Sequence, residues 1–149
     1  MNSTAPPHSR NLRIGRVSLP NQIYLVTIAT QSRVNVFAEF AAGSVAARSL
    51  YDQHLANHLQ TLCYVIMPDH LHWLFQLGST ATLSQVVRSY KAKVSISLGQ
   101  HVWQNGFHDH ALRVAEDVIA VARYIVANPL RAGLCRKLGD YPFWNAVWL

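Results

Sequence analysis

Cys63-Tyr64-Val65-Ile66-Met67-Pro68-Asp69-His70-Leu71-His72-Trp73-Leu74-Phe75-Gln76 is the stretch of sequence that decides the fold of this chain. Its residues are mostly aliphatic and aromatic and show no helical period, which predicts β-strands. The dipeptide Pro68-Asp69 interrupts them with a turn signal. We therefore expect two antiparallel strands, Leu59–Met67 and His70–Leu77, joined by a tight hairpin turn.

Two histidines, His70 and His72, lie at the start of the second of these strands. Side chains at alternate positions of a strand point to the same face, so both imidazoles should point one way and Leu71 the other. Two neighbouring imidazoles can hold one divalent ion, although a His-x-His also arises by chance in a chain with eight histidines. Trp73 and Phe75 share the face of Leu71, which favours a sheet with one face on the core and the other open to a site.

The rest of the chain predicts three helices and two more strands around this hairpin. A capping box at residues 82–85 predicts the start of one helix, Gly99 predicts its end, and Pro129 predicts the end of the last helix. The expected elements are, in order, a strand at 22–30, a helix at 39–58, the two hairpin strands, a helix at 82–98, a short strand within 102–113 and a helix at 115–128. This order predicts an α+β fold, a ferredoxin-like antiparallel sheet with helices on one face.

Length and composition indicate one globular domain with short extensions. The chain has 149 residues, half of them hydrophobic, and no apolar run reaches the roughly 18 residues that a membrane span needs. We expect a basic N-terminal arm at 1–20, the domain at 21–133, and a basic and aromatic C-terminal tail at 134–149 that packs over the domain or against a partner. The N-terminus does not resemble a secretory signal. Cys63 and Cys135 lack the spacing of a zinc site and indicate free thiols in a reducing compartment, so we expect a cytoplasmic protein.

The balance of charge favours a polyanionic partner. Thirteen Lys and Arg outnumber seven Asp and Glu, for a net charge of +6. Nucleic acid is the usual partner of such a protein, although composition alone also fits a merely basic soluble protein. We expect phosphates to be held in three separate places, by Arg10, Arg13 and Arg16 in the arm, by Arg88, Lys91 and Lys93 on one helix, and by Arg131 near the end of the domain.

The last predicted helix carries Tyr124 and Asn128, which are four residues apart and therefore share one face. Taken alone, Tyr124 fits a core or rim tyrosine and Asn128 fits a helix end. Tyr90 is a rival for any nucleophilic role, but it lies in the apolar stripe of its own helix, which indicates a position in the core.

These motifs together resemble a known family. Residues 67–73 (Met-Pro-Asp-His-Leu-His-Trp), followed by residues 124–133 (Tyr-Ile-Val-Ala-Asn-Pro-Leu-Arg-Ala-Gly), resemble the single-tyrosine HUH transposases, and among them the branch of REP-associated tyrosine transposases. Three further stretches, 15–17, 103–110 and 140–144, resemble the same branch, so the likeness covers nearly the whole chain. The resemblance implies a fold of the HUH nuclease type.

The resemblance also implies a role for each matching residue. His70 and His72 match the family's two metal-binding histidines, and the metal of such enzymes is Mg²⁺ or Mn²⁺. Tyr124 matches the nucleophile, and Asn128 matches a polar position that helps to complete the metal site. A second His-x-His at 108–110 lies on the segment before the last helix, where relatives keep only part of it. We favour a structural or DNA-contacting role for that second pair over a second metal site.

The function that the resemblance implies is that of a metal-dependent endonuclease and strand transferase for single-stranded DNA, which cuts near hairpins through a 5′-phosphotyrosine intermediate. Its partner would be single-stranded DNA with a REP-like palindromic hairpin, and it would act as a monomer or homodimer associated with the nucleoid. One alternative is a catalytically silent, domesticated, sequence-specific DNA-binding protein. Another is a metal-dependent phosphodiesterase that uses water and leaves no protein adduct on the DNA.

Overall fold

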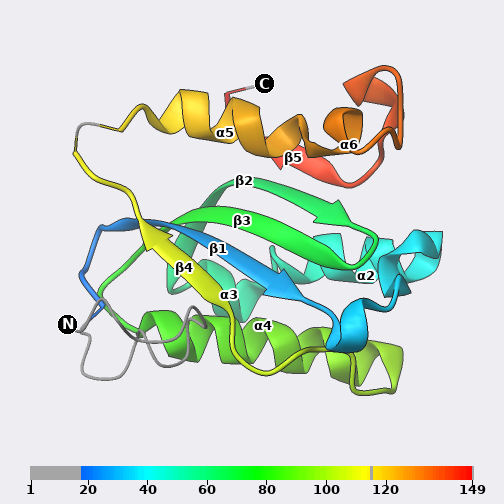
Figure 1. The fold of residues 1–149 in the computed structure, drawn as a ribbon. Coiled ribbons are helices and arrows are strands. Elements are labelled where there is room, and N and C mark those ends of the chain that lie inside the picture. The colour runs from blue at the N-terminus through cyan, green and yellow to red at the C-terminus, as the bar shows by residue number, and fades with distance from the viewer. Residues whose placement is uncertain (1–17, 115, 149) are drawn as a thin grey trace.

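Residues 18–114 and 116–148 are described in a computed structural model, and the predicted arm contacts Arg10, Arg13 and Arg16 lie outside these ranges. An antiparallel sheet forms the centre of the molecule (Figure 1). Its strands are β1 (Ile23–Ala29), β2 (Leu59–Met67), β3 (His70–Leu77), β4 (His108–Ala111) and β5 (Trp144–Ala146), in the spatial order β4-β1-β3-β2-β5. The order of the first four strands is ferredoxin-like, as the sequence predicts.

The hairpin of β2 and β3 has the predicted bounds. Met67 pairs with His70, so only Pro68 and Asp69 form the turn. β1 pairs with the other edge of β3, which places His72 opposite Thr27. β3 is therefore an inner strand whose residues are fixed from both sides.

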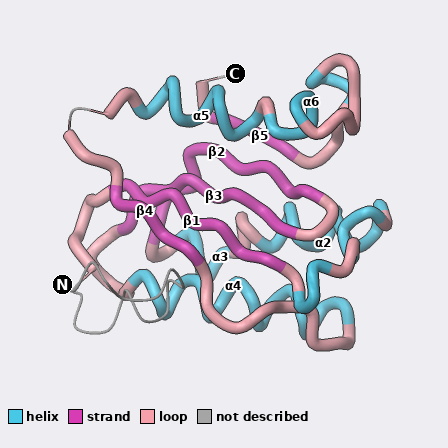
Figure 2. The backbone as a smooth tube through the Cα atoms, viewed as in Figure 1, coloured by secondary structure: helices cyan, strands magenta, loops and turns pink. Residues whose placement is uncertain are grey.

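Three helices cover one face of the sheet: α2 (Phe40–Ser49), α3 (Gln53–Ala56) and α4 (Leu83–Leu98) (Figure 2). Leu71, Trp73 and Phe75 point to this face and are completely buried. The prediction of one continuous helix at 39–58 is wrong. The chain turns after α2, and the Asp52 carboxylate accepts a hydrogen bond from the His54 amide, which caps the separate helix α3.

The helix α4 begins and ends where its local sequence predicts. The Thr82 hydroxyl accepts a hydrogen bond from the Gln85 amide, and the Gln85 side chain accepts one from the Thr82 amide. Gly99 ends the helix in the left-handed conformation with φ of 69°. Tyr90 is buried in the core as predicted, and its hydroxyl donates to the Ala46 carbonyl oxygen at 2.9 Å.

On the opposite face of the sheet, the longest described helix is α5 (Val118–Val126), which covers that face only in part (Figure 1). The expected arrangement had helices on one face; α2, α3 and α4 lie there, while α5 packs against β2 and β5 on the other side. The Asp117 carboxylate caps α5 at its start. The chain kinks after Ala127 into α6 (Asn128–Arg131), whose second residue is Pro129, as expected from the missing amide hydrogen of proline.

The C-terminal segment adds the edge strand β5 to the sheet, a strand that the sequence did not predict. Val65 pairs with Trp144, and the preceding Phe143 is buried. Gly43 of α2 lies against the Phe143 ring so closely that an added Cβ would overlap it. This close approach explains a glycine inside a helix, where it otherwise costs stability.

The remaining regular elements among the described residues are three short 3-10 turns: η1 (Gln31–Arg33), η2 (Val36–Ala38) and η3 (Leu138–Asp140). Within the described ranges, no helix is both long enough and apolar enough to cross a bilayer.

Candidate active site

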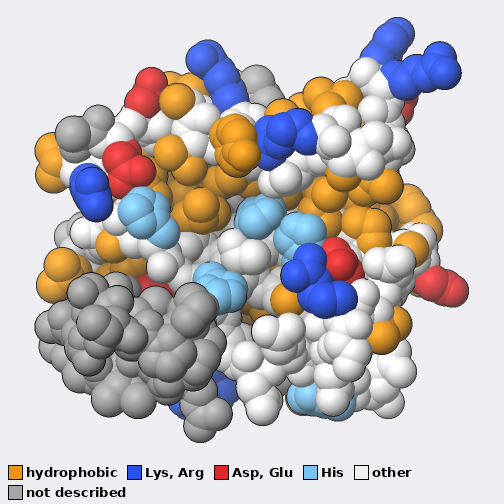
Figure 3. Space-filling view, in the orientation of Figure 1, with side chains coloured by type: hydrophobic (Ala, Val, Ile, Leu, Met, Phe, Trp, Pro, Cys, Tyr) orange, Lys and Arg blue, Asp and Glu red, His pale blue; other side chains and the backbone are white. Residues whose placement is uncertain are grey.

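The two histidines of β3 lie side by side on the face of the sheet that α5 covers only in part. Their ring centroids are 5.0 Å apart and the rings are nearly perpendicular, at 81°. Both side chains are half-buried, whereas Leu71 between them points into the core. Figure 3 shows histidine side chains gathered on this open face among hydrophobic side chains, with lysine and arginine side chains nearby.

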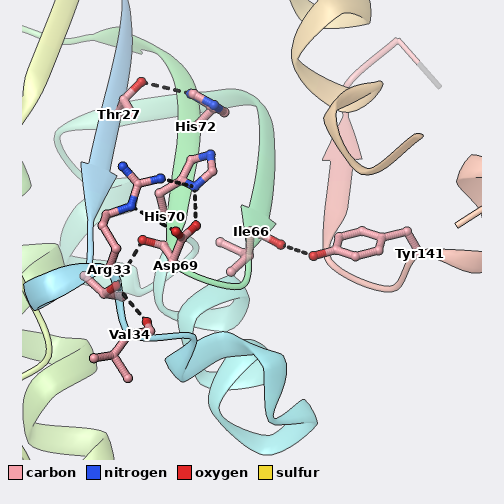
Figure 4. Close-up of polar contacts among 9 residues, drawn as sticks. Thr27, Arg33, Val34, Ile66, Asp69, His70, His72 and Tyr141 are labelled. Carbon is pink, nitrogen blue, oxygen red and sulfur yellow. Dashed lines mark hydrogen bonds and ion pairs between the residues drawn. The ribbon is translucent and has the colours of Figure 1, made fainter. Parts of the chain in front are cut away.

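Each imidazole is held through its Nδ1 atom, which leaves Nε2 for another ligand (Figure 4). His70 Nδ1 lies 2.7 Å from the Asp69 carboxylate, and His72 Nδ1 lies 2.9 Å from the Thr27 hydroxyl. The Asp69 carboxylate can only accept, so His70 Nδ1 carries the hydrogen of that bond. The Thr27 hydroxyl can accept as well as donate, and we assign the same tautomer to His72, the one that leaves Nε2 open. Metal-binding histidines are commonly oriented in this way by a carboxylate or hydroxyl behind them. The donor set therefore fits a divalent ion.

The surroundings keep His72 neutral and Asp69 charged. Burial, and then the charges of His70, Arg131 and Arg33, lower the pKa of His72 to about 4. Partial burial opposes ionisation of Asp69, but hydrogen bonds from His70 and Arg33, together with the Arg33 charge, lower the pKa of this carboxyl overall. At neutral pH His72 thus offers a lone pair, and Asp69 offers an anion that strengthens the imidazole of His70 as a ligand.

Tyr124 lies on the outer side of α5 and is 67% exposed, so its phenol is accessible to a large substrate. The Arg131 guanidinium carbon lies 3.8 Å from the centre of the Tyr124 ring, a cation–π contact. The charge of Arg131 also acts on His72. The predicted nucleophile and the histidine pair, which are 52 to 54 positions apart in the sequence, are thus on the same side of the sheet.

Asn128 begins α6 and is half-buried. Its amide nitrogen donates to the Ile125 carbonyl oxygen at 3.1 Å, which orients the side chain and leaves its oxygen for another partner. In 18–114 and 116–148, no group of three or more His, Cys, Asp or Glu side chains lies together as a metal site. The resemblance implies that the side-chain oxygen of Asn128 completes a site with the histidine pair.

The second histidine pair differs from the first. His108 lies on the edge strand β4 opposite Thr27, in the same row of the sheet as His72. His110 Nε2 lies 3.0 Å from the Glu116 carboxylate, so the nitrogen that is left open in the first pair is occupied here. This contact supports a structural role for His110.

The predicted phosphate contacts on α4 have unequal surroundings. Lys91 Nζ donates to the carbonyl oxygens of Gln104 and Gly106, at 3.0 Å and 2.7 Å, and so holds the 104–106 loop. Lys93 lies 3.4 Å from the Asp52 carboxylate. Arg88 is exposed beside a hollow between α4 and this loop. Arg88 is thus an exposed α4 cation at the edge of this hollow.

Three residues of this site are not marked as site residues by the sequence: Thr27, Arg33 and Asp69. Thr27 comes from β1, Arg33 from η1 and Asp69 from the hairpin turn. Arg33 Nε donates to the Asp69 carboxylate at 2.9 Å. Asp69 is part of the turn signal and directly precedes His70, and this adjacency is the one local feature that links it to the histidines. Nothing local marks Thr27 or Arg33, because only the sheet pairing brings them to the histidines.

Comparisons with known proteins agree with this geometry. A REP-associated tyrosine transposase of Escherichia coli K12 is 29% identical over 82 residues, which cover 54% of this chain and 50% of that relative. A Haemophilus influenzae protein assigned to the same group is 25% identical over 138 residues, 81% of this chain and 77% of the relative. The chain thus aligns with about half the length of the first relative and with more of the second.

Solved structures share the fold. One is a REP-associated tyrosine transposase bound to a REP hairpin, with a TM-score of 0.69 and 22% identity over 87% of this chain and 79% of that one. Another is a Deinococcus radiodurans R1 protein described as a transposase, with a TM-score of 0.50 and 17% identity over 76% of this chain and 95% of the other. The family model described as "Transposase IS200 like" matches residues 18–128. The chain belongs to the IS200-like transposase family.

Proposed function

We propose that this protein cuts and rejoins single-stranded DNA beside hairpins through a covalent bond between Tyr124 and a 5′ phosphate. One observation carries the proposal: two imidazoles with open Nε2 atoms lie on the face of the sheet against which α5 packs, and α5 presents an exposed tyrosine that Arg131 contacts. A protein that only binds DNA needs neither the histidine pair nor the accessible phenol. The family to which the chain belongs supports the same conclusion.

The protein's own residues account for binding and positioning. His70 and His72 would hold a divalent ion through Nε2, with the side-chain oxygen of Asn128 as a further ligand. A bound Mg²⁺ or Mn²⁺ would draw charge from the phosphate and align it for attack. Imidazole ligands suit Mn²⁺ better than Mg²⁺, which prefers oxygen and retains waters, so we expect Mn²⁺ to bind more tightly.

The chemical step conserves the energy of the phosphodiester bond that it breaks. The Tyr124 phenol loses its proton to solvent, and its oxygen attacks the phosphorus. The bond between phosphorus and the 3′ oxygen breaks, and that oxygen takes up a proton as a free 3′ hydroxyl. Because the 5′ phosphate stays esterified to Tyr124, a later 3′ hydroxyl can restore the strand without another energy source.

The proposed DNA partner is a hairpin with single-stranded flanks. A solved member of the REP-associated group is bound to a REP hairpin, and the net charge of +6 suits a polyanion. Arg131, with the exposed Arg88, would contact phosphates, together with the arm arginines that lie outside the described residues. Either a monomer or a homodimer is compatible with this arrangement, because each chain carries the histidines and Tyr124.

The test is an adduct assay. Hairpin oligonucleotides with randomised single-stranded flanks, labelled at the 3′ end, are incubated with protein and Mn²⁺ and separated on a denaturing gel. We expect a protease-sensitive band that resists SDS and is lost with chelator and in His70→Ala and His72→Ala. His54→Ala, which removes an exposed histidine on α3, is the control and should keep the band.

The other outcomes identify the alternatives. Cut DNA without an adduct would indicate a phosphodiesterase that uses water. Shifted but uncut DNA, at all metal concentrations, would indicate a catalytically silent binding protein. Adduct formation that persists in both histidine variants would reject the proposed metal site.

A further inference from the structure

The backbone beside the histidine pair is strained at two consecutive residues. Ser32 and Arg33 have φ angles of 55° and 54°, in the left-handed region, although neither is glycine. In this conformation the Cβ of an L-residue approaches the following carbonyl oxygen, which is unfavourable. Such strain persists only where the surrounding structure imposes it, and it is concentrated at functional sites.

Hydrogen bonds around the hairpin turn impose this conformation. Thr30 is completely buried, and its hydroxyl lies 2.8 Å from the Val34 carbonyl oxygen and 3.1 Å from that of Asp69. The Thr30 amide also donates to the backbone carbonyl oxygen of Asp69, and the Phe37 amide donates to the carbonyl oxygen of Pro68. The segment 30–37 is therefore clamped onto the turn between β2 and β3, with its strained residues held outward.

The strained segment delivers one guanidinium to the histidines (Figure 4). Arg33 Nε donates to the Asp69 carboxylate, and one Nη lies 3.4 Å from His70 Nδ1. That nitrogen already donates its hydrogen to Asp69, so it offers Arg33 no acceptor. The Arg33 side chain is 56% exposed. Its Nε is held by the Asp69 carboxylate, while the hydrogens on its Nη atoms stay available for another acceptor.

An exposed ion pair with Asp69 does not account for this arrangement, because such pairs add little stability. A guanidinium fork next to a metal-binding histidine pair matches the oxygens of a phosphate, which it can bind in two-pronged fashion. We propose that Arg33 is a further catalytic residue, which binds a non-bridging oxygen of the scissile phosphate. This inference rests on the proposed function and adds a residue to it.

The first test separates catalysis from folding. Arg33→Gly and Arg33→Ala remove the same guanidinium, but only glycine relieves the strain. We expect both to slow single-turnover adduct formation by about 100-fold or more, as for loss of a donor to a transition-state oxyanion, with DNA affinity reduced by less than about threefold, as for one of several phosphate contacts. Arg33→Gly should nevertheless melt higher than Arg33→Ala, by about 2 °C.

Two control variants isolate the guanidinium. Ser32→Gly relieves strain at the neighbouring position and should keep the adduct rate. Arg48→Ala removes an exposed charge from α2, on the other face of the sheet, and should also keep it. Arg33 variants that retain a third or more of the wild-type rate would overturn the inference, as would Arg33→Gly melting below Arg33→Ala. Because wild-type protein must form the adduct in the same assay, these results are distinct from a failure of the proposed function.

The second test distinguishes a phosphate ligand from a residue that merely orients Asp69 and His70. For a phosphate ligand, the maximal adduct rate at saturating Mn²⁺ falls while the half-saturating Mn²⁺ concentration stays within about twofold of wild type. For an orienting residue, excess Mn²⁺ restores the rate, because weakened histidine ligation raises the metal requirement by about 10-fold or more. Restoration by Mn²⁺ would therefore overturn the assignment. Arg33→Lys, which keeps the charge but loses the fork, should recover part of the rate.

Discussion

Replacing each of two tyrosines with phenylalanine should affect different properties of this protein. Tyr124→Phe removes one oxygen from a side chain that is 67% exposed and whose hydroxyl makes no hydrogen bond within the described residues. The ring face that Arg131 contacts at 3.8 Å stays in place. Substitutions at such surface positions usually change stability by less than about 0.5 kcal/mol. We therefore expect unchanged melting, DNA affinity close to wild type, and no covalent adduct.

Tyr90→Phe is the matched control, because it makes the same chemical change in the core. Tyr90 is completely buried, and its hydroxyl donates to the Ala46 carbonyl oxygen at 2.9 Å. Its loss removes this buried hydrogen bond, which contributes about 0.5–1.5 kcal/mol. For a chain of this size, each kcal/mol lowers Tm by about 2–4 °C. The adduct should still form below the lowered Tm.

The assay combines thermal melting with the denaturing gel on the same preparations. The expected result is a crossed pattern, in which Tyr124→Phe melts normally without an adduct and Tyr90→Phe melts lower with one. An adduct on Tyr124→Phe would refute the choice of nucleophile. Burial raises the pKa of Tyr90 well above its usual range and leaves its phenol inaccessible, so this residue should not be the nucleophile. A folded Tyr90→Phe variant that binds DNA but forms no adduct would therefore also refute the choice of Tyr124.

Three further outcomes follow from particular contacts. Thr27→Val keeps the side-chain shape but removes the hydroxyl that contacts His72, a proposed metal ligand. The half-saturating Mn²⁺ concentration for adduct formation should therefore rise by about 10-fold, and an unchanged value would contradict that orienting role. Gly43→Ala should lower Tm because its new methyl meets the buried Phe143 ring, and a higher Tm would mean that the ring moves freely. Burial raises the pKa of Cys63 to about 12. At pH 8 a thiol reagent should therefore label Cys135 quickly and Cys63 only after denaturation. Fast labelling of both thiols in folded protein would contradict this prediction.

The elements that the sequence predicted accurately are those with local causes. The hairpin bounds follow from alternation and a two-residue turn, and α4 follows from a capping box and a glycine. The continuous helix at 39–58 was a wrong prediction, because the Asp52 cap depends on a chain reversal that the helical residues on either side do not indicate. The strand β5 was missed, because three residues carry almost no period and gain their order from β2.

The candidate site divides in the same way. The sequence and the resemblance marked His70, His72, Tyr124 and Asn128, and the alternation of β3 by itself put both imidazoles on one face. The sequence could not show which atoms hold those rings, because Thr27 reaches His72 across 45 positions and Arg33 reaches Asp69 across 36. It also could not show that α5 crosses to the open face with its tyrosine exposed.

The primary sequence thus determined the strand, the turn and the pair of imidazoles, since each depends on neighbours within a few residues. Tertiary structure alone decided which nitrogen of each ring stays open, which arginines lie beside them and which tyrosine solvent can reach. These properties depend on contacts between distant segments, and such contacts form only when the sheet and its helices pack together.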